Sequence, residues 1–152
     1  MTRLGGHLMN IDRFTTAAQQ TLAAAQTVAV EMSHSEYGTL HLLRAMMDNP
    51  IGLISTVIER AGYRPAALSD IVDAELNRLP TVSTSAPRTP GPSGPLVQSL
   101  SNAEQYARGM GDRFISLEHL LLALADTPGP AREAMTTLGI QADLLQQTVT
   151  DM

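Results

Sequence analysis

Apolar residues recur every three or four positions along most of this chain, whereas stretches in which apolar and polar residues alternate are absent. Near the N-terminus, for example, Ala18, Leu22, Ala25 and Ala29 follow this spacing. An α-helix has about 3.6 residues per turn, so this spacing puts the four side chains on one face of a helix. Alternation would instead have indicated β-strands. The pattern therefore predicts an all-α fold.

Start and stop signals divide the first half of the chain into four expected helices. Thr15 or Thr16 can cap the first helix with its hydroxyl group. Pro50 ends the second helix, because a residue that precedes proline avoids helical geometry. Gly62 ends the third helix in left-handed geometry, and Pro65 fits the first turn of the fourth. The expected helices cover Thr16–Val30, Leu40–Met47, Leu53–Ala61 and Pro65–Arg78.

Residues 80–95 form the strongest break in the pattern. Five of the nine prolines of the chain fall in this segment, together with Gly91 and Gly94. Proline lacks the backbone N–H group and glycine loses much conformational entropy on ordering, so neither a helix nor a central strand is expected here. We expect an exposed and partly extended linker that separates two halves of similar size.

The two halves are related by an internal duplication. When the sequence is shifted against itself by 78 positions, 11 of the 31 residues between 20 and 50 meet an identical residue. His41 then pairs with His119. After a one-residue deletion, Gly62 pairs with Gly139. Such self-similarity is typical of two copies of one supersecondary unit.

The duplication predicts eight helices, arranged as two tandem four-helix repeats about a pseudo-twofold axis. In the second repeat, Ser116 is expected to cap the helix Leu117–Asp126, Gly139 to end the next helix, and Asp143–Thr150 to form the last. Aromatic residues make up only 3% of the chain, so we expect both repeats to share one core in a compact domain. The expected boundaries are a flexible N-terminal extension at 1–8, the first repeat at 9–79, the linker at 80–95 and the second repeat at 96–152.

Composition and charge exclude several classes of function. All ten basic residues are arginine, so the chain has neither a P-loop lysine nor a Schiff-base lysine. It has no cysteine, which excludes disulfides, thiolate nucleophiles and cysteine-ligated zinc. The net charge of −5 argues against binding nucleic acid or an anionic membrane. No apolar stretch approaches the roughly 20 residues of a membrane span or forms the core of a signal peptide, so we expect a cytoplasmic protein.

Four stretches of the sequence resemble the Clp N-terminal repeat domain. They are Met9–Thr15, Tyr37–Leu43, Leu76–Pro80 and Gly111–Leu121. The first and the third look most like the ClpB branch of the family, the AAA+ protein disaggregases. Three features depart from the family pattern. Residues 1–8 have no counterpart, the linker is longer and richer in proline, and His119 stands where ClpB members more often have an apolar residue.

The resemblance implies a non-catalytic module that binds no cofactor itself. In the family, this domain precedes two AAA+ modules of the same parent chain, and those modules use ATP and Mg²⁺. It captures unfolded or aggregated polypeptide in an apolar groove and hands it to the AAA+ ring. The ClpA and ClpC relatives imply an alternative, in which the domain docks a folded adaptor protein. A stand-alone regulatory protein built from Clp repeats is a further alternative.

Candidate substrate-binding residues follow from motif and from spacing. By motif, the contact residues of the family correspond to Thr15, Asp112 and Glu118. Each also has a structural explanation, since Thr15 and Asp112 suit caps and Glu118 suits the first turn of a helix. The apolar candidates, for a groove at the seam between the repeats, are Leu96, Leu100, Tyr106, Phe114, Ile115 and Leu117. At helical spacing such residues are usually core, so their exposure decides between the two roles.

The histidines are the remaining candidates for metal or acid–base chemistry. His41 and His119 hold equivalent positions near the start of a helix in each repeat. They could form a paired site, or each could be a structural residue with hydrogen bonds near the helix N-terminus. Their duplication favours the structural role. His7 and His34 lack partners at ligand spacing, so we expect them on the surface and expect no metal site.

Overall fold

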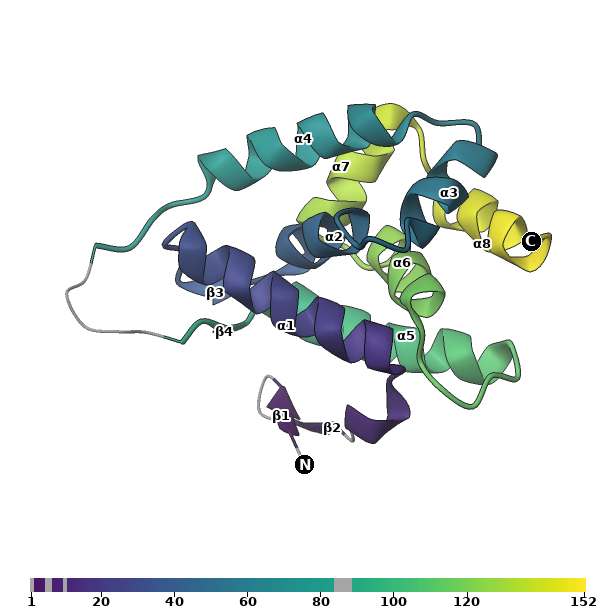
Figure 1. Ribbon diagram of the computed structural model, residues 1–152, viewed down its shortest axis with the longest axis horizontal. Coiled ribbons are helices and arrows are strands. Elements are labelled where there is room, and N and C mark those ends of the chain that lie inside the picture. Colours follow the sequence, from purple (N-terminus) through teal and green to yellow (C-terminus); the bar gives the residue numbers. More distant parts are fainter. Residues whose placement is uncertain (1, 5–6, 10, 84–88) are drawn as a thin grey trace.

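The computed structural model describes residues 2–4, 7–9, 11–83 and 89–152, and within these ranges the chain forms eight α-helices (Figure 1). The first repeat contains α1 (Thr16–Glu31), α2 (Thr39–Met47), α3 (Leu53–Arg60) and α4 (Pro65–Arg78). The second repeat contains α5 (Gly94–Gly109), α6 (Leu117–Asp126), α7 (Pro130–Leu138) and α8 (Ala142–Thr150). The predicted helical fold with two four-helix repeats is therefore confirmed.

Short strands accompany the helices, and the hydrophobic pattern did not predict them. β1 (Thr2–Leu4) pairs with β2 (His7–Met9) in antiparallel orientation. The pair covers most of residues 1–8, where a flexible extension is expected, and reaches one residue beyond them. A 3₁₀ turn, η1 (Ile11–Arg13), follows. β3 (Glu36–Tyr37) pairs with β4 (Gly91–Pro92) in parallel. Strands of two or three residues are too short for alternation to be detected.

The first helix of each repeat begins with a hydroxyl cap at an equivalent position. The Thr15 hydroxyl accepts a hydrogen bond from the Ala18 amide of α1 at 3.1 Å. The Ser93 hydroxyl accepts from the Leu96 amide of α5 at 3.2 Å. Helix α5 thus starts at Gly94, inside the segment expected to be linker. Its first turn tolerates Pro95 because the first amides of a helix have no partner in the helix.

Each repeat is joined to the other by backbone hydrogen bonds ahead of these caps. The Ile115 amide donates to the Arg13 carbonyl at 2.8 Å, and the Thr15 amide donates back to the Ile115 carbonyl at 3.0 Å. In the other half, the Ser93 amide donates to the Tyr37 carbonyl at 2.9 Å, beside the β3–β4 pair. The segment that leads into each first helix therefore lies along a loop of the opposite repeat.

The core runs without interruption through both repeats. Helix α1 packs on α2 and α5 on α6, while α4 contacts α7 and α3 contacts α8 across the pseudo-twofold axis. At one crossing, the Tyr63 hydroxyl donates to the carbonyl of Gly139, which ends α7 with φ near +90°. None of the helices in the described ranges has the length and apolar character needed to span a membrane.

The described parts of the connection between α4 and α5 lie against the first repeat. The Val82 amide donates to the Ser33 carbonyl at 2.7 Å. The Gln26 side chain of α1 donates to the Pro90 carbonyl at 2.8 Å. In Figure 1, β4, which precedes α5, lies beside the end of α1 and β3. These contacts hold one end of the connection beside the loop between α1 and α2 and the other end beside α1.

Candidate functional site

A buried histidine organises the loop that leads into α6. His119 is 2% exposed, and its Nδ1 accepts a hydrogen bond from the Ser116 backbone amide at 2.9 Å. This contact assigns the proton to Nε2, which lies 2.8 Å from Oδ2 of Asp112 and donates to it. His119 therefore fixes the position of the half-exposed Asp112 carboxylate. The structural role considered for His119 is the one that this geometry supports.

Phe114 is the exposed apolar residue of the same loop. Its side chain is 45% exposed, and the guanidinium carbon of Arg113 lies 5.5 Å from the ring centroid. The backbone pairing with Ile115 places Thr15 beside this loop, and the half-buried Glu118 follows in the first turn of α6. We call Thr15, Asp112, Phe114 and Glu118 the repeat-2 face. It combines one accessible aromatic ring with two carboxylates.

The other apolar candidates do not belong to this surface. Leu96 and Leu100 of α5 are buried, as are Ile115 and Leu117 at the entrance to α6. They pack in the core shared by the two repeats, so a ligand has no access to them in this structure. Packing between helices therefore explains the helical spacing of these residues.

Tyr106 lies in a polar notch instead of an apolar groove. Tyr106 is half-buried, and burial first, with the Asp126 charge second, raises its pKa. The notch, about 260 Å³ in volume, is also lined by Asn102, Gln105 and Gln146. An apolar side chain would leave these polar groups without water when it bound, so this notch is poorly suited to apolar ligands.

The first repeat contains the counterpart of the His119 arrangement. His41 Nδ1 accepts from the Gly38 amide at 2.9 Å, and its Nε2 lies 2.8 Å from Nδ1 of His34. Both rings are buried, so the expectation that His34 lies on the surface is wrong. Burial, followed by the neighbouring His34, lowers the pKa of His41 to about 4. Burial also lowers the pKa of His34. Both imidazoles are therefore neutral at pH 7.

The sequence contained a signal for this pair that helical spacing did not reveal. The shift of 78 positions that aligns His41 with His119 also aligns His34 with Asp112. In each repeat, the side chain seven positions before the helix histidine forms a hydrogen bond with Nε2 of that histidine. Since one partner is an imidazole and the other a carboxylate, the two sites share geometry but differ in charge.

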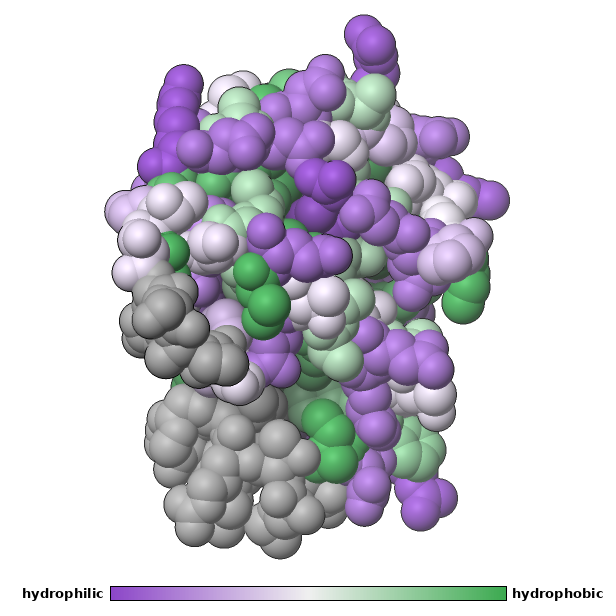
Figure 2. All heavy atoms as spheres, turned by 60° about the vertical axis from the view of Figure 1, so that its left-hand side comes forward, coloured by the Kyte–Doolittle hydropathy of each residue, from purple (hydrophilic) through white to green (hydrophobic). Residues whose placement is uncertain are grey.

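Among the described residues, no group of three or more His, Asp or Glu side chains is arranged to hold a metal ion. Large apolar side chains that are exposed lie on separate elements. They are Val30, Ile51, Phe114, Leu144 and Met152. On the face in Figure 2, hydrophobic residues likewise form small patches between hydrophilic ones. Scattered exposure of this kind is ordinary. Phe114 differs because Asp112 and Glu118 lie in the same loop and the turn that follows.

Replacement of Thr15 by alanine is expected to lower the free energy of unfolding by about 1 kcal/mol, because the Ala18 amide loses its acceptor. Thr15→Ser keeps the hydroxyl and should change stability little. Ser93→Ala removes the equivalent cap of α5 and should have a similar effect. Urea denaturation of the three variants measures this. If Thr15→Ala has the same free energy of unfolding as wild type, the hydroxyl is not needed as a cap.

Comparison with known proteins places this architecture in a family. The family model for the Clp repeat (R) N-terminal domain matches residues 13–138. The chaperone protein ClpB of Meiothermus ruber is 38% identical over 122 residues, 78% of this chain and 14% of that protein. ClpB of Rickettsia bellii (strain RML369-C) is 32% identical over 141 residues, 93% of this chain and 16% of that protein. The chain thus spans less than a fifth of these relatives' length.

Solved structures agree on the fold. The Hsp104 N-terminal domain from Candida albicans aligns with a TM-score of 0.78 at 24% identity, covering 89% of this chain and 87% of that one. The ClpV N-domain in complex with a VipB peptide aligns with a TM-score of 0.69 at 20% identity, covering 93% and 92%. Together with the duplicated four-helix repeats and the similarity to ClpB, these matches show that the chain belongs to the Clp repeat (R) N-terminal domain family.

Proposed function

We propose that this chain is the substrate-binding N-terminal domain of a ClpB-type ATP-dependent chaperone and captures unfolded or aggregated polypeptide. The AAA+ modules of a longer parent chain would use ATP and Mg²⁺, and the domain itself would be non-catalytic and cytoplasmic. The similarity to ClpB over most of the chain supports this assignment. The peptide complex of the ClpV N-domain supports polypeptide as the ligand class.

The single observation that carries the proposal is the exposed Phe114 ring, in a loop that also holds the half-exposed Asp112 carboxylate and leads into the helix turn of Glu118. Unfolded chains expose apolar side chains that folded proteins bury, and many also carry basic residues. The accessible Phe114 ring can bind the apolar side chains of an unfolded chain. The carboxylates of Asp112 and Glu118 can attract its basic residues. Burial of one half-exposed ring stabilises a complex by roughly 1 kcal/mol, so capture at this face is weak. Weak capture suits a module that must release its substrate to a motor.

Replacement of Phe114 by aspartate is expected to weaken binding of a permanently unfolded protein at least fivefold, because it removes the exposed ring. The probe is hen lysozyme that has been reduced and carbamidomethylated, so that it is permanently unfolded and still basic, and fluorescence anisotropy measures the dissociation constant. Ile51→Asp is the matched control, since it places the same charge on another exposed apolar residue. Equal affinity of Phe114→Asp and wild type, or an equal loss in Ile51→Asp, would contradict the assignment of this face.

The second candidate function is docking of a folded adaptor protein. The ClpV N-domain bound to a peptide of VipB favours it, because that ligand is a segment of one particular protein. An adaptor should form a complex of fixed 1:1 stoichiometry with this chain. In that case the chain should not bind denatured proteins. The gene sequence downstream of residue 152 distinguishes both functions from a stand-alone Clp-repeat protein.

A further inference from the structure

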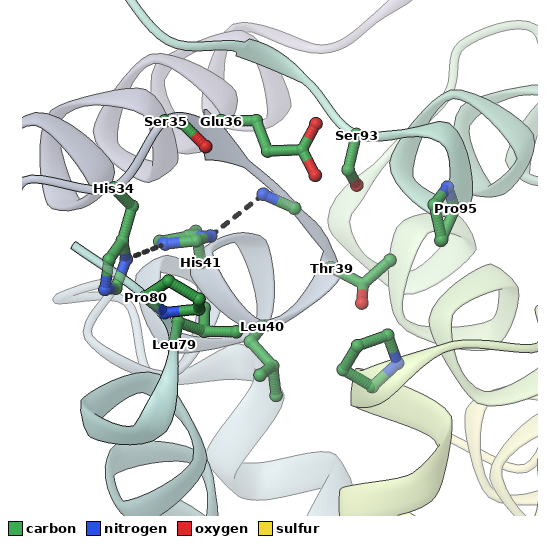
Figure 3. Close-up of a pocket in the computed structure, with 12 residues that line it drawn as sticks. His34, Ser35, Glu36, Thr39, Leu40, His41, Leu79, Pro80, Ser93 and Pro95 are labelled. Atoms are coloured by element: carbon green, nitrogen blue, oxygen red, sulfur yellow. Dashed lines mark hydrogen bonds between the residues drawn. The ribbon is translucent and has the colours of Figure 1, made fainter. Parts of the chain in front are cut away.

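The first repeat contains a pocket of about 330 Å³ between the start of α2, the end of α4 and the starts of α5 and α7. Its apolar wall comes from four elements, which contribute Leu40, Leu79, Pro80, Pro95 and Pro130. Figure 3 shows Leu40, Leu79, Pro80 and Pro95 around the hollow, with the hydrogen-bonded His34 and His41 at one side. We call this hollow the repeat-1 pocket.

The repeat-1 pocket is the pseudo-twofold counterpart of the repeat-2 face. The shift of 78 positions pairs Leu40 with Glu118 and Ser93 with Thr15. Both sites lie where a loop of one repeat meets the cap of the other repeat's first helix. The chemistry differs, because leucine stands in the first repeat where the second has a carboxylate.

The electrostatics of the pocket favour an uncharged side chain. Its two imidazoles hydrogen-bond to each other and are neutral at pH 7, so they neither attract nor repel a charge. A charged side chain would lose its hydration against three prolines and two leucines without gaining a partner. The exposed Glu36 is the charged residue among the lining residues (Figure 3). Its carboxylate complements a basic residue next to the one that enters.

The size of the pocket sets the length of the occupant. Its volume of about 330 Å³ is at the lower end of the range of about 300–1,000 Å³ for ligand sites. One or two side chains of an extended polypeptide fit this volume, and a whole helix or folded surface does not. We propose that the repeat-1 pocket is a second polypeptide-binding site, which takes an apolar side chain of an extended chain that has a basic residue beside it. This proposal rests on the polypeptide-binding function proposed above.

The test uses the full chain labelled with ¹⁵N and three Gly/Ser-rich 12-residue peptides, which differ in one central pair. The pairs are Leu-Arg, Leu-Glu and Ser-Arg. The Leu-Arg peptide should shift the amide resonances of Gly38 and Thr39 in a saturable way. The Leu-Glu peptide should bind these residues at least threefold more weakly, because Glu36 repels it. The Ser-Arg peptide should produce no saturable shift there.

Two variants with the same charge change separate pocket binding from general electrostatics. Pro130→Glu puts a carboxylate at the pocket wall, in the exposed first turn of α7. Ala66→Glu does the same in the exposed first turn of α4, away from the pocket lining. A carboxylate is favoured in the first turn of a helix, so both should fold. Pro130→Glu should weaken the Leu-Arg shifts at Gly38 at least threefold, and Ala66→Glu should not.

The outcomes distinguish this proposal from the function on which it rests. If the resonances of Asp112 and Phe114 shift on titration but those of Gly38 and Thr39 do not, the repeat-1 pocket is not a binding site and polypeptide binding stands. If neither set shifts, both proposals fail. Equal effects of Pro130→Glu and Ala66→Glu would also overturn the pocket assignment. Shifts at Gly38 that persist in Phe114→Asp would support an independent second site.

Discussion

Replacement of Phe14 by alanine is expected to lower the free energy of unfolding by about 3–5 kcal/mol. The Phe14 ring is 2% exposed and belongs to the core shared by the two repeats. Its backbone lies beside Ile115 of the opposite repeat. The variant therefore loses the buried area of the ring and leaves a cavity at the junction of the repeats. Urea denaturation followed by circular dichroism at pH 7.5 measures the loss.

Phe114 provides the matched control, because it is the second of the two phenylalanines and its ring is 45% exposed. Phe114→Ala should change the free energy of unfolding by less than about 1 kcal/mol. Domains of this size are stable by about 5–15 kcal/mol, so Phe14→Ala can be partly unfolded without denaturant. Phe14→Leu should lower the free energy of unfolding by less, so its loss can be measured if Phe14→Ala is too unstable. Equal losses in Phe14→Ala and Phe114→Ala would refute the difference in their packing.

The two phenylalanines also show what sequence reasoning can reach. Each follows the same two residues, Asp12-Arg13 and Asp112-Arg113. One ring is core and the other is surface, because Phe14 pairs with Ile115, and Ile115 takes the buried position in the second segment while Phe114 beside it stays exposed. Local sequence does not contain that information. Burial depends on which element packs against a residue, and this is decided by tertiary structure.

The helices were predictable because their boundaries have local causes. Pro50, Gly62 and Pro65 restrict the backbone wherever they occur, so the ends of α2, α3 and the start of α4 follow from residue type. The duplication then carries the same boundaries into the second repeat. The start of α5 at Gly94 was less predictable, because proline and glycine are equally suited to a linker and to the first turn of a helix.

The candidate site was predicted only in part, for a related reason. Helical spacing indicates that Leu96 and Leu100 share a helix face, but it does not indicate whether that face meets solvent or the other repeat. The structure places both in the core. The repeat-1 pocket was missed altogether, because its wall comes from residues that lie far apart in the sequence, such as Leu40, Leu79 and Pro130. Neither motif nor periodicity connects such residues.

Acidification from pH 7.5 to pH 5 is expected to destabilise the domain through His41. Its pKa is about 4 in the folded chain and about 6.5 when unfolded. Between these values the unfolded chain binds a proton that the folded chain does not, so stability falls as the pH falls. The contribution is fully present above pH 6.5 and declines towards pH 4. Its loss amounts to about 2 kcal/mol by pH 5 and about 3 kcal/mol by pH 4.

The physical cause of this dependence is the hydrogen-bonded position of the buried ring. His41 Nδ1 accepts the hydrogen bond of the Gly38 amide, and His41 Nε2–H donates to Nδ1 of His34. Both nitrogens of His41 and Nδ1 of His34 are therefore already used in hydrogen bonds and cannot take a second proton without breaking one. Protonation of His41 would break the contact with Gly38 at the start of α2. The lowered pKa of the buried His34 acts in the same direction.

His41→Gln tests this explanation without removing the helix contact. Glutamine at the third position of a helix can accept the backbone hydrogen bond that His41 Nδ1 accepts, and it does not titrate. Denaturation in urea at pH 7.5, 6.5, 5.5 and 5.0 should show a slope at least twofold smaller in His41→Gln than in wild type. Carboxylates titrate in both proteins and cancel from the comparison. If His41→Gln keeps the full pH dependence, the buried imidazole pair is not its source, and the neutral character assigned to the wall of the repeat-1 pocket loses its support.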